Sequence, residues 1–240
     1  MSMKTHPTNT IKTDLFITQV RFAKYLMKPI IALFVHDPRC SVQSVNGMIR
    51  ALSSEYEFRL FSKNEMETGF FEGVDMVAFP GGFGDSDTYD TLLKQNKKAI
   101  REFVRNGGRY LGICMGAYWA DKHYFNILDN VESVQYIKRP NTCTRRPHAK
   151  NMPVVWEGQN KNMFFYDGCA LVGNNLKFET IATYSNGDPM AIIQDRIGLI
   201  GCHPESEQFW YDSYSWMKGK YHHGQHHTLL LDFVNKLMEK

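Results

Sequence analysis

The side chains with the clearest chemical potential lie in the segment Gly112-Ile113-Cys114-Met115-Gly116, where a cysteine has a glycine two residues to either side. This spacing is typical of a nucleophile elbow, in which a buried strand turns sharply into a helix and the nucleophile occupies the corner. Glycines allow the two backbones to approach closely, and a helix N-terminus favours a thiolate. The pattern predicts Cys114 as a nucleophile, and a buried structural cysteine is the alternative interpretation.

A second motif, His203-Pro204-Glu205, follows the apolar segment Leu199-Ile200-Gly201-Cys202. A thiol nucleophile needs a base that takes its proton and returns it to the leaving group, and histidine suits this role at neutral pH. A carboxylate on the other imidazole nitrogen fixes the tautomer and the orientation of the ring. We therefore predict His203 as the acid/base and Glu205 as its orienting carboxylate, with an ordinary loop as the alternative.

A third motif, Pro80-Gly81-Gly82, follows another apolar segment. Attack on a carbonyl places negative charge on oxygen, and backbone N–H groups held in position stabilise that charge. The amides of Gly81 and Gly82, with that of Met115 directly after the cysteine, are the predicted oxyanion donors. A simple strand-exit loop explains the glycines equally well.

The elements that must position these motifs alternate between strand and helix in the first half of the chain. We expect strands over 30–35, 56–61, 74–79 and 110–114, and helices over 42–52 and 88–106, the latter stopped by Gly107-Gly108. In the second half we expect strands over 153–157, 163–166, 178–184, 190–194 and 197–201, and helices over 205–216 and 225–238. Such alternation implies right-handed crossovers and a parallel sheet. All three motifs follow predicted strands, so they should meet at the carboxyl edge of that sheet.

Composition places the chain among ordinary globular proteins. Its 240 residues suffice for one α/β domain, which we place at 29–240 after an N-terminal extension over 1–28 that contains a short amphipathic helix at 13–27. The formal charge of +3 gives no reason to expect nucleic acid or membrane as a partner. Five scattered cysteines, Cys40, Cys114, Cys143, Cys169 and Cys202, indicate a reduced, cytoplasmic protein.

Taken together, the motifs resemble the class I glutamine amidotransferase-like superfamily. Within it, the segments Gly112–Tyr118 and Gly201–Glu205 look most like the N-terminal domain of biotin–protein ligases, here free-standing. The resemblance covers about residue 29 to the C-terminus. It implies a flavodoxin-like three-layer α/β sandwich with a mostly parallel central sheet, a Cys114–His203–Glu205 triad and no cofactor.

Two positions depart from the patterns of this superfamily. Tyr118, a predicted substrate-site residue, stands four residues after the cysteine, where glutamine-using members carry glutamine, so the resemblance implies amide chemistry but leaves open whether glutamine is the substrate. Met115 stands where the intracellular-protease and glyoxalase-type branches have histidine, which disfavours those branches. The chain also has no Gly-Arg-Gly-Arg-type adenylate loop, so we do not expect it to biotinylate proteins.

Three further signals carry less functional weight. The histidines of the segment 222–227 suggest a metal site, but Gly224 weakens the helix that would align them, and we expect a solvated surface without a physiological metal. A basic loop around Cys143 is expected to be solvated. The aromatic residues that follow His203-Pro204-Glu205 are expected to pack in the core or to form a pocket wall; they are Trp210, Tyr211, Tyr214 and Trp216.

The function that these patterns favour is hydrolysis of a small amide or ester through a thioester on Cys114. Two other hypotheses stay open: a catalytically silent binding or regulatory module with the same fold, and a thiol-based sensor. A second copy of the chain or a partner subunit could complete the activity.

Overall fold

Short apolar segments form the parallel half of a large central sheet. The computed structural model of the chain describes residues 27–36, 42–66, 68–82 and 86–240. In spatial order the parallel strands are β2 (Glu57–Phe61), β1 (Ile30–Phe34), β3 (Met76–Phe79), β4 (Arg109–Ile113) and β11 (Ile197–Ile200). Strands β1, β3, β4 and β11 are almost entirely buried, as expected of strands covered on both faces.

Antiparallel strands extend this sheet beyond β11. They are β10 (Pro189–Gln194), β9 (Glu179–Tyr184), β6 (Lys150–Trp156) and β7 (Gln159–Phe165), which brings the sheet to nine strands within the described residues. Two strands that the sequence pattern did not predict, β5 (Val131–Gln135) and β8 (Cys169–Gly173), pair with each other in a separate ribbon.

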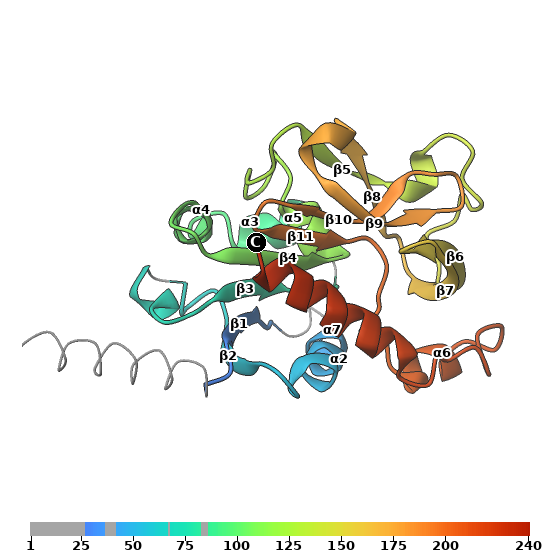
Figure 1. Ribbon diagram of the computed structural model, residues 1–240, viewed down its shortest axis with the longest axis horizontal. Coiled ribbons are helices and arrows are strands. Elements are labelled where there is room, and N and C mark those ends of the chain that lie inside the picture. Colours follow the sequence, from blue (N-terminus) through green and yellow to red (C-terminus); the bar gives the residue numbers. More distant parts are fainter. Residues whose placement is uncertain (1–26, 37–41, 67, 83–85) are drawn as a thin grey trace, which may run out of the picture.

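Helices cover both faces of the sheet. On one face, α2 (Val42–Leu52) packs against α7 (Gln225–Met238), and on the other lie α3 (Ser86–Leu92), α4 (Lys97–Arg105) and α5 (Met115–Trp119) (Figure 1). A separate hydrophobic cluster fills each interface between helices and sheet. The predicted three-layer α/β fold is therefore confirmed.

Two of the expected helices differ from the structure. The helix expected over 88–106 is divided into α3 and α4, because the chain turns between them. In this turn the Asn96 side chain donates to the Lys63 carbonyl oxygen at 2.8 Å, a contact that favours a turn over a continuous helix. The helix expected over 205–216 is reduced to α6 (Gln208–Asp212), because the chain turns at Pro204 and Glu205 and Glu207 is extended. The helices at 42–52 and 225–238 have the expected bounds.

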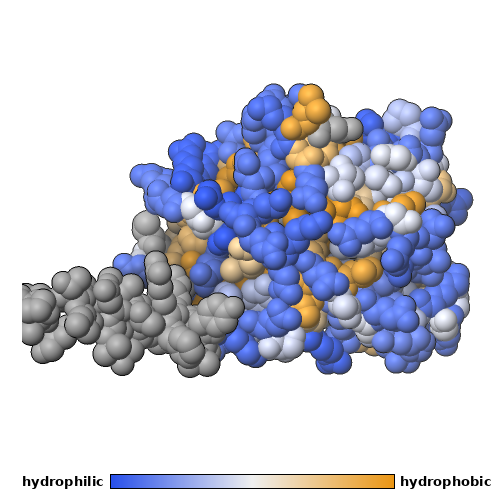
Figure 2. Space-filling view, in the orientation of Figure 1, coloured by the Kyte–Doolittle hydropathy of each residue, from blue (hydrophilic) through white to orange (hydrophobic). Residues whose placement is uncertain are grey.

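The surface of the described residues is mainly hydrophilic on the face shown in Figure 2, where apolar side chains form small, separate groups. No helix of the described residues is long and apolar enough to cross a membrane. Most of the helix expected over 13–27, and the extension 1–28 that contains it, lie outside the described residues.

Candidate active site

Cys114 occupies the corner between β4 and α5. Its backbone angles, φ 48° and ψ −99°, are unusual for a residue with a side chain and reverse the chain direction directly after the strand. A Cβ atom at Gly112 would lie 2.4 Å from the Gly116 carbonyl oxygen, and one at Gly116 would lie 2.2 Å from the Phe79 carbonyl oxygen. Only glycine allows this close approach, so the strained elbow predicted from the spacing is present.

The sulfur of Cys114 is nearly covered by protein. The residue is 5% exposed, and its Sγ donates to the Tyr166 carbonyl oxygen at 3.6 Å. Its backbone N–H donates to the Ile200 carbonyl oxygen at 2.8 Å, which ties the corner to the end of β11. The Cys114 sulfur also lies close enough to the His203 imidazole to influence its pKa. The two residues therefore meet, although 89 positions apart, because β4 and β11 are neighbours in the parallel sheet.

His203 is held from several sides. Its backbone N–H donates to the Phe164 carbonyl oxygen at 2.9 Å, and its ring packs at centroid distances of 5.9 Å from Phe164 and 5.4 Å from Trp210. Its Nδ1 lies 2.8 Å from the Glu205 Oε1 atom. Since an ionised carboxylate only accepts hydrogen bonds, Nδ1 is the donor, and the other ring nitrogen is left for contacts on the opposite side of the ring. Trp210 therefore lies beside the His203 ring, in agreement with the expectation that an aromatic residue of this segment forms a wall of the site.

The charge state of His203 follows from these contacts. Burial favours the neutral ring, but the Glu205 carboxylate and the Cys114 sulfur outweigh it and raise the pKa of His203 to about 10. The ring is therefore protonated near neutral pH.

Glu205 has a partner that the sequence motifs do not indicate. The Ser44 hydroxyl, on α2, donates to Glu205 Oε1 at 2.6 Å and accepts the Gly81 N–H at 2.9 Å. Ser44 and Glu205 are both fully buried. The only signal in the sequence is the place of Ser44 on the buried face of an amphipathic helix, and that does not distinguish a functional serine from a structural one.

The other predicted substrate-site residues have different surroundings. Because the Gly81 N–H is engaged by Ser44, Gly82 and Met115 stay as the candidate oxyanion donors. The Met115 N–H has no hydrogen-bond acceptor within the described part of the chain. Tyr118 donates its hydroxyl to the Asp167 carbonyl oxygen at 3.1 Å, and burial raises its pKa above the ordinary value, which keeps the phenol neutral.

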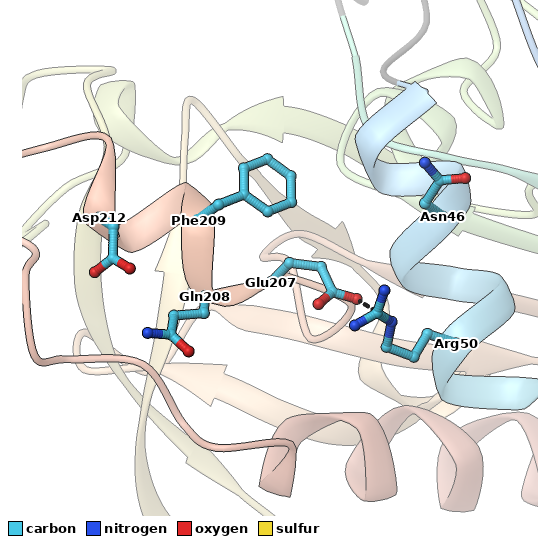
Figure 3. Close-up of a pocket in the computed structure, with 6 residues that line it drawn as sticks. All are labelled: Asn46, Arg50, Glu207, Gln208, Phe209 and Asp212. Carbon is cyan, nitrogen blue, oxygen red and sulfur yellow. Dashed lines mark ion pairs between the residues drawn. The ribbon is translucent and has the colours of Figure 1, made fainter.

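A hollow of about 370 Å³ lies between α2 and the segment that contains α6 (Figure 3). Its lining comes from α2 and from the segment that contains α6: Asn46, Arg50, Glu207, Gln208, Phe209 and Asp212. Arg50 Nε lies 3.1 Å from Glu207 Oε1 across it. The two glutamates therefore have different partners: Glu205 contacts His203, and Glu207 contacts Arg50 and lines the hollow.

The histidine segment and the basic loop are not fully solvated, because several of their side chains are buried or paired within the fold. His222 is buried, its Nε2 lies 2.9 Å from the Ser206 carbonyl oxygen, and its ring stacks on that of His226 at 4.1 Å. No group of three or more potential metal ligands occurs among the described residues. In the basic loop, Arg139 forms a bidentate ion pair with Asp188. The described cysteines are free thiols, and Cys143 is exposed.

Comparisons with known proteins show which sequences and folds this chain is similar to. Residues 35–135 match the family model described as biotin-protein ligase, N terminal. This match agrees with the resemblance inferred from the sequence motifs. The matched segment includes Ser44, Gly81 and Cys114 and ends before His203. No curated protein matches the chain.

Solved structures share the fold over most of the chain. A glutamine amidotransferase from Thermotoga maritima aligns with a TM-score of 0.64 at 12% identity, covering 89% of this chain and 100% of that one. Another glutamine amidotransferase aligns at 0.59 with 16% identity, covering 88% and 99%. PurLQS from Thermotoga maritima aligns at 0.61 with 14% identity, covering 88% and 100%. At these identities the likeness shows the glutamine amidotransferase-like fold.

Proposed function

We propose that this protein is a cysteine-dependent hydrolase of a small amide or ester, acting through a thioester on Cys114. The observation that carries the proposal is the proximity of Cys114 to His203 at the carboxyl ends of β4 and β11, with Nδ1 of His203 hydrogen-bonded to Glu205. The same fold in proteins named glutamine amidotransferases supports amide chemistry.

In the first half-reaction the Cys114 thiolate attacks the carbonyl carbon and forms a C–S bond. The carbonyl oxygen becomes an oxyanion, which the amides of Met115 and Gly82 stabilise. The intermediate collapses, the bond to the amine or alcohol breaks, and the leaving group takes the proton from the His203 imidazolium. The result is a thioester on Cys114 and a neutral His203.

In the second half-reaction, water attacks the thioester and gives its proton to His203. The C–S bond breaks, the carboxylic acid leaves, and the thiolate–imidazolium pair is restored. Throughout, Glu205 accepts the Nδ1–H of His203, which keeps the other ring nitrogen directed at the reacting atoms.

The substrate class is narrowed by Tyr118. Its neutral hydroxyl is hydrogen-bonded to a backbone carbonyl in the position where glutamine-using relatives carry an amide side chain. We therefore propose a small amide or ester other than glutamine.

One observation favours the silent binding module as a second candidate. Both Cys114 and His203 are only 5% exposed, and the Tyr166 carbonyl oxygen contacts the sulfur. A substrate must displace this contact before its carbonyl carbon reaches Sγ, whereas a module without catalysis needs no such access.

Acylation by p-nitrophenyl acetate tests the proposal. We expect a burst of nitrophenolate equal to one acetyl group per chain, with the adduct located on Cys114 by peptide mass spectrometry. The exposed Cys143 is an internal control for ordinary thiol reactivity. The variant Cys114→Ala should lose the burst, and His203→Gln should slow it about a hundredfold or more.

A Cys114 that reacts no faster than Cys143, at a rate unchanged in His203→Gln, would refute the hydrolase and favour the silent module. Sulfenylation of Cys114 by dilute peroxide, without any acylation, would instead support the thiol sensor.

A further inference from the structure

Glu205 is not oriented by His203 alone. Oε1 accepts from two donors, His203 Nδ1 at 2.8 Å and the Ser44 hydroxyl at 2.6 Å, whereas Oε2 is buried without a hydrogen-bond partner in the described part of the chain. A carboxylate held by one oxygen keeps a single orientation only while both donors remain. The Ser44 hydroxyl is the donor that does not belong to the triad.

Helix α2 places Ser44 at the carboxylate with little freedom. A Cβ atom at Gly47 would lie 2.1 Å from the Glu205 carbonyl oxygen, so the helix backbone packs directly on this residue. On the outer side, Arg50 of the same helix pairs with Glu207 (Figure 3). The helix is thus fixed to the loop on both sides of Glu205.

The same hydroxyl also links the acid/base to the glycine turn. Ser44 Oγ accepts the Gly81 N–H at 2.9 Å, and a Cβ atom at Gly81 would lie 2.4 Å from His203 Cε1. One buried side chain therefore connects the turn after β3, which carries the candidate oxyanion donor Gly82, with the carboxylate that orients His203.

We propose that Ser44 is a positioning residue of the active site, which holds Glu205 in the orientation that directs His203 at Cys114 and at the same time fixes the Pro80-Gly81-Gly82 turn. The effect of Ser44 on catalysis rests on the proposed hydrolase function. The effect of Ser44 on the orientation of Glu205 and His203 does not depend on that function and can be measured separately.

Replacement of Ser44 by alanine should lower the rate of Cys114 acylation and change the NMR signal of the His203 imidazole. The acylation rate at neutral pH should fall about tenfold, because His203 loses its single orientation. The variant Ser44→Thr, which keeps a hydroxyl, should restore most of both.

Other groups near the carboxylate need a control. The titratable side chains that act on Glu205 are His203, Cys202, Tyr211 and His222, and the side chain facing it from α2 is Ser44. Ser206 is equally buried and lies 3.2 Å from the Tyr211 hydroxyl and 3.3 Å from His222 Nε2, outside the triad. Ser206→Ala therefore removes a matched hydroxyl, and it should leave the acylation rate and the imidazole signal unchanged.

The experiment combines two readouts on the full chain. The first is the rate of acetylation of Cys114 by p-nitrophenyl acetate against pH, in wild type, Ser44→Ala, Ser44→Thr and Ser206→Ala. The second is the nitrogen NMR signal of the His203 imidazole, assigned with His203→Gln, which reports the hydrogen bond that Nδ1–H donates to Glu205. In Ser44→Ala this signal should shift or broaden, and in Ser206→Ala it should not.

A wild-type acylation rate and an unchanged imidazole signal in Ser44→Ala would overturn the inference while the hydrolase proposal stands. Equal slowing in Ser44→Ala and Ser206→Ala, with no change in the imidazole signal, would also overturn it, because general destabilisation would then explain the rate. If wild-type Cys114 shows no enhanced acylation, the hydrolase proposal fails. The imidazole signal alone then decides: a change in Ser44→Ala supports positioning, and no change refutes it.

Discussion

Gly81→Ala should disable the site without replacing any of the reacting groups. The added Cβ would lie 2.4 Å from His203 Cε1 and 3.0 Å from Nδ1, whereas ordinary contact begins at 3.4 Å. The ring must therefore retreat by about 1 Å. The rings of Phe164 and Trp210 and the hydrogen bond to Glu205 restrict that movement.

A displacement of about 1 Å in a catalytic group typically costs about a hundredfold in rate, and overpacking a buried site costs about 1–3 kcal/mol of stability. We expect both effects in Gly81→Ala, measured by acetylation of Cys114 and by urea unfolding. Gly69→Ala is the matched control, because no atom lies within 4 Å of a Cβ at that position. A Gly81→Ala protein with wild-type acetylation would refute the placement of His203 against this turn.

Three further predictions concern stability. Burial lowers the pKa of His203, but Glu205 and Cys114 outweigh the effect of burial and raise this pKa from 6.5 to about 10. The bound proton therefore stabilises the fold fully below pH 6.5 and less as the pH approaches 10. In urea titrations, the unfolding free energy of wild type relative to His203→Gln should decline over that interval. Burial lowers the pKa of His222 from 6.5 to about 4 and that of His226 to about 3. The unfolded chain therefore takes up protons first, and the unfolding free energy should fall as the pH drops below 6.5. In acid titrations the unfolding free energy of His226→Leu should fall less steeply than that of wild type, and an equal slope would contradict the reasoning. Gly116→Ala places a Cβ 2.2 Å from the Phe79 carbonyl oxygen, a backbone atom that cannot turn aside, and should cost about 3 kcal/mol in thermal or urea unfolding, whereas a loss below 1 kcal/mol would contradict the elbow geometry.

The meeting of Cys114 with His203 could be predicted from the sequence because each follows an apolar strand. Parallel strands end at one edge, so residues after two such strands are close if the strands are neighbours. The glycines around Cys114 could be interpreted for a similar reason, since an elbow requires close backbone approach wherever it occurs. These expectations depend on local patterns alone.

Ser44 could not be predicted in this way. Its contact with Glu205 joins positions 161 residues apart, and a serine on the buried face of a helix has the same local pattern whether or not it meets a functional group. The engagement of the Gly81 amide has the same cause, since its acceptor is Ser44. The division of the helix expected over 88–106 likewise depends on a distant partner, the Lys63 carbonyl oxygen that Asn96 binds.

The pairing of β4 with β11 makes the length of one short segment a functional property. Ile113 is aligned with Ile200, and three residues later the chain presents His203 to the sulfur that follows Ile113. One residue inserted between Ile197 and His203 would carry the imidazole forward by about 3.3 Å, beyond hydrogen-bonding reach of Cys114. Insertions at the turn between β6 and β7 would lengthen a hairpin and leave this spacing intact. In related sequences, the interval between the strand and the histidine is therefore as informative as the histidine itself.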